Sequence, residues 1–250
     1  MPFTVDDLIR LYDKKRDEYG KEAHRHTSAI MKEAKEQHRR EFFRSGKKKD
    51  HEQSWRAFKG KSLEKLLIYI LEKEVKALGL QIISGGKLDS QNLPPFLDKV
   101  RQNLLVDFGE FGKHLPDVDL VVFDPEDGAI LAVLSVKVTL RERIAQTGYW
   151  KRKFSDIPAM RDIKVYFVTL DEDETLVQRH PAKKGRAIVE TDTDGSYVLS
   201  AATIEESGRV KMFDQLIEDL KEIRDLHVEE DSSSTTSIDK PSCIEDFHAE

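Results

Sequence analysis

Apolar residues gather in two short runs near the middle of the chain, Leu120–Phe123 and residues 129–136. The segment between them, residues 124–128, reads Asp-Pro-Glu-Asp-Gly. Proline presets φ and glycine accepts a positive φ, so this segment is typical of a tight turn. Two apolar runs joined by such a turn predict an antiparallel hairpin at the centre of a buried sheet.

Polar residues mark the open end of this predicted hairpin. Asp117 and Asp119 precede the first run, and Ser135 and Lys137 lie at the end of the second. Side chains two residues apart point to one face of a strand, and the antiparallel pairing places the start of one strand beside the end of the other. Acids and a lysine should therefore meet at one edge of the sheet. Buried charge needs a partner or a metal, and a simple Asp–Lys ion pair is the plainest interpretation of two such residues alone.

A second strong pattern follows the helical period. Apolar residues recur at 3.6 spacing over residues 62–78, which predicts a helix with Ser62 as its N-cap and Gly79 after its last turn. Glu64 then lies in the first turn, where a carboxylate complements the helix dipole. Alternatively, Glu64 lends its carboxylate to a metal site in the core.

Weaker patterns predict the remaining elements. Residues 4–45 read as helix with an interruption after Tyr19, and Gly85-Gly86 reads as a turn. Residues 187–190 and 197–199 flank Asp194-Gly195, a pair typical of a hairpin turn. Further helices are expected over residues 96–105 and 212–226, and strands over residues 80–84 and 164–170.

Charge is distributed unevenly along the 250 residues, which carry a net charge of -6. Residues 31–62 hold 11 Lys or Arg against 5 Asp or Glu, and residues 137–164 hold 8 against 3. Residues 205–250 hold 14 acids against 5 bases. The local field, not the sum, determines phosphate binding, so the overall acidity does not exclude a nucleic-acid partner. Solvated faces are the alternative interpretation of these charges.

Other features of the sequence exclude several classes of protein. There is no apolar run of membrane-spanning length and no signal peptide, so we expect a cytoplasmic protein without a membrane partner. The single cysteine, Cys243, excludes an intrachain disulfide, which fits a reducing cytosol. Gly-rich phosphate loops, Cys/His zinc spacing and the G-x-S-x-G motif do not occur, which argues against kinase, zinc-protein and hydrolase functions of those types.

The order of these motifs resembles a known nuclease family. Pro116-Asp117-Val118-Asp119 followed by Ser135-Val136-Lys137 is similar to the PD-(D/E)xK nuclease motif. The triplet Arg141-Glu142-Arg143 directly after the lysine strand, and the upstream segment from Ser54-Trp55 to Glu64, resemble type II restriction endonucleases of the group that recognises CCGG and CCNGG sites, such as BsaWI, AgeI, NgoMIV and EcoRII.

The resemblance implies an α/β fold: a restriction-endonuclease-like core with a central mixed β-sheet flanked by helices, plus an N-terminal helical region. We therefore expect a helical region over residues 1–60 for dimerisation or DNA contact, a nuclease core over residues 61–228, and a disordered acidic tail over residues 229–250.

The resemblance also implies catalytic roles. Asp119 is the first choice of Mg²⁺ ligand, with Asp117 as the alternative, and Lys137 would orient or deprotonate the attacking water. Ser135 stands where the family pattern has an acid, so a second carboxylate must come from elsewhere. The position about a dozen residues after the lysine holds Tyr149 and Trp150, which leaves Glu64 as the best donor.

Base readout is expected from the residues that follow the lysine strand. Arginine bonds guanine O6 and N7 bidentately and a carboxylate accepts from cytosine N4, so Arg141, Glu142 and Arg143 suit adjacent C·G pairs. Gln146 lies one turn further, within reach of a base or a phosphate. A palindromic duplex DNA site implies a homodimer. The competing functions are a junction or repair nuclease of the same fold, and a DNA-binding protein without catalysis.

Overall fold

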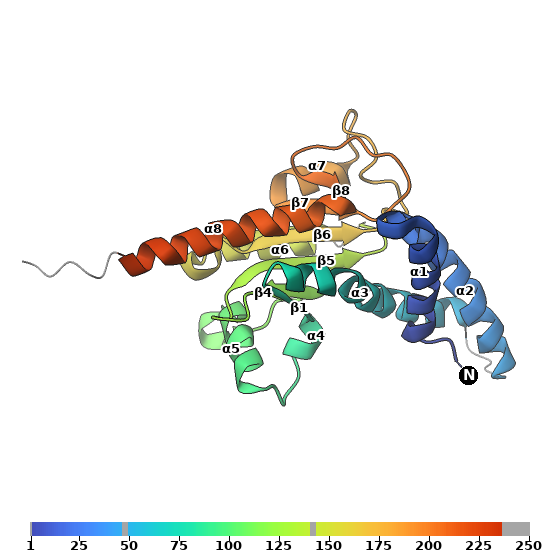
Figure 1. Ribbon diagram of the computed structural model, residues 1–250, viewed down its shortest axis with the longest axis horizontal. Helices are drawn as coiled ribbons and strands as arrows, with labels where there is room; N and C mark the ends of the chain where they lie inside the picture. Colours follow the sequence, from blue (N-terminus) through green and yellow to red (C-terminus); the bar gives the residue numbers. More distant parts are fainter. Residues whose placement is uncertain (1, 47–49, 141–143, 237–250) are drawn as a thin grey trace, which may run out of the picture.

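A six-stranded mixed sheet with the order β1-β4-β5-β6-β7-β8 forms the centre of the computed structural model, which describes residues 2–46, 50–140 and 144–236 (Figure 1). Strands β1, β4 and β5 are antiparallel neighbours, whereas β5, β6, β7 and β8 run parallel. A two-stranded sheet, β2-β3, lies apart from it. The strands are β1 (Gln81–Ser84), β2 (Val106–Asp107), β3 (Lys113–His114), β4 (Leu120–Phe123), β5 (Ile130–Lys137), β6 (Lys164–Thr169), β7 (Gly195–Val198) and β8 (Val210–Met212).

Helices cover both faces of the sheet, and α1 and α2 gather at one end of the molecule (Figure 1). Short 3₁₀ segments connect several of them. The helices are α1 (Val5–Tyr19), α2 (Thr27–Arg44), α3 (His51–Ala77), α4 (Gly85–Leu88), α5 (Pro95–Leu104), α6 (Ile144–Ser155), α7 (Lys184–Asp192) and α8 (Leu216–Thr236), and the 3₁₀ segments are η1 (Gly20–His26), η2 (Gly109–Phe111), η4 (Pro158–Met160) and η5 (Phe213–Gln215). The α/β class, the mixed sheet and the N-terminal helical region are as predicted.

Alternation along the strands divides the core between the two faces of the sheet. Leu120, Val122 and Leu134 pack against α3 and α8, together with residues of α1 and α2. Val121 and Val133 point to the other face and pack against α5 and α6. On the same face, residues of β6, β7 and β8 pack against α6 and α7. By the same alternation, Asp119 and Lys137 point to the second face, beyond the end of its apolar core.

The central hairpin is confirmed. Leu120 pairs with Leu134 and Val121 with Val133, so the start of β4 lies beside the end of β5. Within the turn, the Asp124 carboxylate accepts a hydrogen bond from the backbone N–H of Glu126 at 2.7 Å, and Gly128 adopts φ 79°. The turn residues therefore act as the sequence predicts.

Helix α3 begins eleven residues before the predicted N-cap: it starts at His51 and Ser62 is buried in its interior. The carboxylate of Asp50 caps it by accepting from the N–H of Glu52 at 2.9 Å. The early turns carry Trp55, which packs against Phe58 and the N-terminal helices. This tertiary burial extends the helix past Gly60, a weak helix former whose added Cβ would meet open space.

Two other predictions are wrong. Residues 187–190 belong to α7, not to a strand, and β7 pairs with β6 in parallel, so Asp194-Gly195 is not a hairpin turn. Parallel neighbours need a crossover, and α7 supplies it. The Asp194 carboxylate instead accepts from the N–H of Val165 at 2.8 Å and pairs with Lys151 at 2.7 Å. Gly85-Gly86 is likewise not a simple turn, because it begins α4, which Ser84 caps.

The C-terminal helix is longer than predicted. Helix α8 runs to Thr236, past Glu229, where composition predicts the start of a disordered acidic tail. Leu216 and Leu220 anchor α8 on the sheet, and once a helix is nucleated each added residue gains a hydrogen bond, which composition alone does not reveal. Residues 237–250 of the expected tail lie outside the described residues. Along the part of the chain that the structure does describe, none of the helices combines the length and the hydropathy that a bilayer crossing demands.

Candidate active site

Asp119 lies at the mouth of the hairpin, directly before β4. Its Oδ2 accepts hydrogen bonds from the Lys137 Nζ at 2.5 Å and from the backbone N–H of Val136 at 2.6 Å. The side chains of Lys137 and Asp119 are 14% and 15% exposed. The predicted meeting of an acid and the lysine at one sheet edge is therefore present. A pair this enclosed is held rigidly and interacts more strongly than an exposed one.

Glu64 approaches this pair from α3, on the opposite face of the sheet. Burial raises the pKa of its carboxyl, and the negative charge of Asp119 raises that pKa further. The ammonium group of Lys137 acts in the other direction. Glu64 lies in the middle of α3 and not in its first turn, so complementation of the helix dipole does not explain it. Its electrostatic neighbours are Asp119, Lys137 and Asp117 near the sheet edge, together with Lys61 of α3.

Helix α6 closes the other side of the edge. The Thr147 hydroxyl donates to the Oγ of Ser135 at 3.2 Å, in a buried contact. One residue earlier, the Gln146 amide donates to the Oδ2 of Asp117 at 2.6 Å. Asp117 is exposed, and within the described residues it is Asp119 that contacts Lys137. The other residues predicted to contact bases, Arg141, Glu142 and Arg143, lie outside the described residues.

The donor set suits a hard divalent cation. Asp119 and Glu64 offer carboxylate oxygens, which Mg²⁺ prefers. Burial is the main cause of the raised pKa of Glu64, and the repulsion by the Asp119 carboxylate adds to it; a cation near the two carboxylates would offset that repulsion. Ser135 adds no charge. The residues present therefore fit a magnesium-type site better than a zinc-type site, which uses Cys or His ligands.

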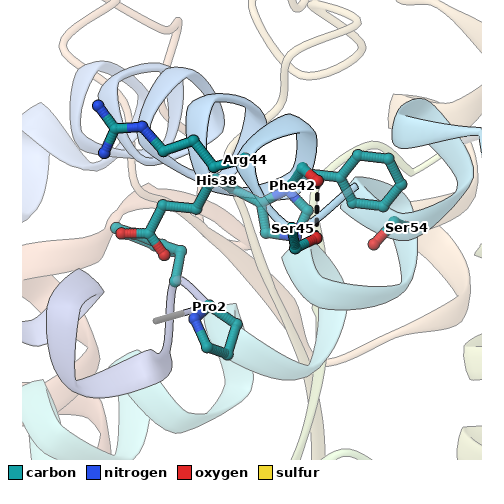
Figure 2. A pocket seen from close by; sticks show the side chains of 8 residues that line it. Pro2, His38, Phe42, Arg44, Ser45 and Ser54 are labelled. Atoms are coloured by element: carbon teal, nitrogen blue, oxygen red, sulfur yellow. Dashed lines mark hydrogen bonds between the residues drawn. The ribbon is translucent and has the colours of Figure 1, made fainter. Parts of the chain in front are cut away.

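Two other features of the molecule lie away from this edge. Asp124, Asp127 and His227 form a group whose ligand atoms lie within 4.8 Å of one another, but it is at the turn between β4 and β5, the opposite end of both strands. A hollow of about 370 Å³ between the N-terminal helices is lined by residues such as His38, Phe42 and Ser54 (Figure 2). Neither contains a residue of the Asp119–Lys137 edge.

Gly85 is a supporting residue that the sequence pattern indicates only as part of a turn. Its N–H donates to the carbonyl of Asp119 at 2.9 Å. A Cβ at this position would lie 2.0 Å from the carbonyl oxygen of Val118. The backbone of α4 therefore approaches the Pro116–Asp119 segment as closely as only glycine permits. The one signal in the sequence is a glycine directly after a predicted strand.

Comparisons with known proteins agree on one family. Residues 96–225 match the family model for BsaWI restriction endonuclease type 2. The protein "Putative type II restriction enzyme MjaVIP" of Methanocaldococcus jannaschii is 35% identical over 212 residues, which cover 79% of this chain and 93% of that protein. The family match includes the hairpin region, and the match to the Methanocaldococcus protein extends across most of the chain.

Solved structures agree on the fold. The restriction endonuclease PspGI in complex with substrate DNA is 13% identical with a TM-score of 0.52, over 88% of this chain and 93% of that one. The specific AgeI–DNA complex is 15% identical with a TM-score of 0.53, over 86% and 91%. At such identities the likeness concerns the fold alone, and the sequence matches carry the family. This chain therefore belongs to the BsaWI family of type II restriction endonucleases, enzymes that cleave DNA.

Proposed function

We propose that this enzyme hydrolyses duplex DNA with Mg²⁺, at a palindromic site with a CCGG or CCNGG core. The observation that carries the proposal is the contact of Asp119 with Lys137 at the sheet edge, with the carboxyl of Glu64 within electrostatic reach. Hydrolysis of a phosphodiester needs a water nucleophile and relief of charge on the phosphate; Lys137, together with a Mg²⁺ ion that Asp119 and Glu64 would hold, would meet both needs.

Each residue of the edge has a distinct role in this proposal. Asp119 and Glu64 hold the metal, and the N–H of Val136 fixes the orientation of the Asp119 carboxylate. The ammonium group of Lys137 orients the attacking water and stabilises the negative charge that develops on the phosphate oxygens. Mg²⁺, when bound, supplies additional charge neutralisation and lowers the pKa of bound water. The buried hydrogen bond between Thr147 and Ser135 joins α6 to the end of β5 and contributes no charge.

Specificity is assigned to Arg141, Glu142 and Arg143, which follow the lysine strand and precede α6. Bidentate contacts of arginine with guanine, and acceptance by glutamate from cytosine, are each worth about 1–3 kcal/mol of discrimination. Gln146, whose amide donates to Asp117, lies one turn past this triplet, and we assign it a further contact with a base or a phosphate. Asp117 then serves to hold Gln146 in place and is not the principal metal ligand.

A homodimer is the assembly that fits a palindromic site, since each half-site then meets an identical protomer. The N-terminal helices α1 and α2 extend from one end of the molecule and are the surface that we assign to this contact (Figure 1). Duplex DNA is the substrate in this proposal, which the DNA-bound state of the structural neighbours supports.

The test is digestion of a phage DNA of known sequence with Mg²⁺. We expect discrete fragments whose ends map to one palindrome. Lys137→Ala should lower the cleavage rate at least about 100-fold, because the variant has no charged donor aimed at the reacting phosphate. Lys99→Ala, which alters an exposed lysine on α5, should leave the pattern and rate unchanged.

Other outcomes would contradict parts of the proposal. Fragments that survive in Lys137→Ala would remove Lys137 from the mechanism. Cleavage of branched substrates but not of the phage DNA would favour a junction or repair nuclease. Binding without any cleavage across Mg²⁺ concentrations would leave a DNA-binding protein.

A further inference from the structure

The segment that joins β6 to α7 begins with four acids, residues 171–174, and continues with basic residues that no acid interrupts. Residues 175–184, here called the basic loop, read Thr-Leu-Val-Gln-Arg-His-Pro-Ala-Lys-Lys. Arg179, His180 and Lys184 in this loop are exposed. Charge runs of this kind are often only solvated, so the position and the support of the loop decide whether it has a function.

The segment directly before the basic loop is attached to the edge that holds Asp119 and Lys137. The N–H of Leu170 donates to the carbonyl of Lys137 at 3.3 Å, and the N–H of Glu172 donates to the carbonyl of Val138 at the same distance. The Glu172 carboxylate pairs with Lys59 of α3 at 2.7 Å. The chain that leads into the basic loop is therefore attached both to the strand of Lys137 and to the helix of Glu64.

Buried polar contacts fix the path of the loop. The Asp171 carboxylate, only 5% exposed, accepts from the N–H groups of Thr175 and Leu176 at 2.8 and 2.9 Å. The guanidinium of Arg186 is fully buried and donates to the carbonyls of Leu176 and Glu205. A buried arginine that bonds two backbone segments holds them together rigidly. The loop thus presents its cations in a preorganised position.

The side chains of the exposed cations Arg179 and Lys184 have no carboxylate partner within residues 2–46, 50–140 and 144–236, while the Glu205 carboxylate accepts from the backbone N–H of Arg179 at 2.6 Å. A third exposed cation, Lys183, donates to the carbonyl of Asp173 at 3.0 Å. No ion pair joins Arg179 or Lys184 to a described acid, whereas Glu172 and Asp171, which precede the loop, are bound to Lys59 and to backbone N–H groups. Lys184 also begins α7, whose first backbone N–H groups add partial positive charge. The basic loop therefore offers cations that are free to meet an anion.

We propose that the basic loop binds the phosphate backbone of duplex DNA and holds the duplex against the catalytic edge. Arg179 and Lys184 contact phosphates and do not read bases, so they set affinity and register without setting sequence preference. The inference rests on DNA being the substrate, as in the proposed function, and adds a binding surface on the side of the sheet edge where β6 ends. Figure 1 shows α7 beside β7 and β8, at the opposite end of the strand order from α4 and α5, which lie near β1 and β4.

The test measures the salt dependence of binding with a 30-base-pair duplex of arbitrary sequence, followed by fluorescence anisotropy without divalent metal. For the double variant Arg179→Ala with Lys184→Ala, we expect the slope of log Kd against log salt to become shallower by about 0.9 for each phosphate that the variant no longer neutralises. Affinity at low salt should fall roughly tenfold or more, equally for all duplex sequences.

Two control variants separate this proposal from simpler explanations. Arg179→Lys with Lys184→Arg keeps the charges and should retain the wild-type slope. Lys99→Ala with Arg161→Ala removes two exposed cations, on α5 and before the start of β6, and should also retain it. A melting curve for each variant excludes unfolding as the cause.

The outcomes are distinguishable from failure of the proposed function. If the wild-type protein binds the duplex and the double alanine variant has the same slope, the basic loop does not contact phosphates and this inference is wrong. If the wild-type protein does not bind duplex DNA at all, the proposed substrate fails first. An equally shallow slope in the Lys99 and Arg161 control would show a diffuse charge effect and would also overturn the inference.

Discussion

At the scale of single residues, the carboxyl group of Glu64 has the clearest electrostatic signature of the site. Burial raises its pKa, and the charge of Asp119 adds to that effect. Because the unfolded chain has a glutamate pKa of about 4.3, the folded chain binds more protons than the unfolded chain above that pH. The stability that Glu64 contributes is therefore present at low pH and declines as the pH rises through the raised pKa.

The variant Glu64→Gln is neutral at every pH, so it should remove this decline. We expect its Tm without metal to exceed that of the wild type at pH 8 and to match it at pH 4. Mg²⁺ should raise the Tm of the wild type by mass action and that of the variant by much less. Cleavage should fall at least about 100-fold, since the proposed metal site has one carboxylate fewer in the variant.

Thermal melts at both pH values, with EDTA or with Mg²⁺, check this prediction. The matched control is Glu72→Gln, an exposed glutamate on the same helix, which should change the Tm little at either pH. A lower Tm of Glu64→Gln at pH 8 would mean that the charged form of Glu64 stabilises the fold, contrary to the direction of its pKa shift.

The sequence predicts only part of this residue-level picture. The alternation of Asp117, Asp119, Ser135 and Lys137 places an acid beside the lysine, because strand periodicity and hairpin pairing are local rules. It does not distinguish Asp119 from Asp117. In the structure Asp119 contacts Lys137, whereas Asp117 accepts from Gln146, a contact that needs the packing of α6 on the sheet. For Glu64, the sequence leaves metal binding and complementation of the helix dipole both open, and its position in the middle of α3 argues against the second.

At the scale of elements, the contact between α4 and the segment before β4 controls where Asp119 lies. Gly85→Ala places a Cβ 2.0 Å from the carbonyl oxygen of Val118, so the backbone on one side must move. We expect a loss of stability of about 1–3 kcal/mol. Cleavage should fall by roughly 10²-fold, because a misplacement of about 1 Å in a catalytic group has an effect of that size.

Gly86→Ala is the paired control for this substitution. A Cβ at Gly86 meets nothing within 4 Å, and Gly86 belongs to the same short helix. It should be neutral or stabilising by up to about 1 kcal/mol. Urea unfolding and cleavage rates of both variants provide the measurement. Equal behaviour of the two would show that the approach of α4 to Val118 does not position Asp119.

Elements with strong local patterns are predicted well, and those defined by long-range pairing are not. Residues 120–137 carry both strand patterning and turn chemistry, so the hairpin is determined locally. The apolar run at residues 187–190 fits a strand or a helix, and only the parallel pairing of β7 with β6 selects the helix. The early start of α3 is another case, because the burial of Trp55 depends on α1 and α2.

At the scale of the whole molecule, the expected boundary at residue 60 falls inside α3. Phe3 and Leu8 belong to the same apolar cluster as Leu66 of α3 and Leu220 of α8. A continuous helix and a continuous core both join the N-terminal helices to the sheet. We therefore expect the region over residues 1–60 and the sheet to unfold as one cooperative unit, even if α1 and α2 also serve a dimer contact.

The two tryptophans of the chain allow this expectation to be tested, because Trp55 lies among the N-terminal helices and Trp150 lies on α6. In Trp150→Phe the fluorescence reports on the first region, and in Trp55→Phe it reports on the second. For each variant, we expect the urea midpoint by fluorescence to coincide with the midpoint by far-UV circular dichroism. Within one variant, a fluorescence transition that precedes the circular dichroism transition would show separate units. Because α3 is attached to both regions and carries Glu64 toward the Asp119–Lys137 edge, we expect the two probes to report one transition.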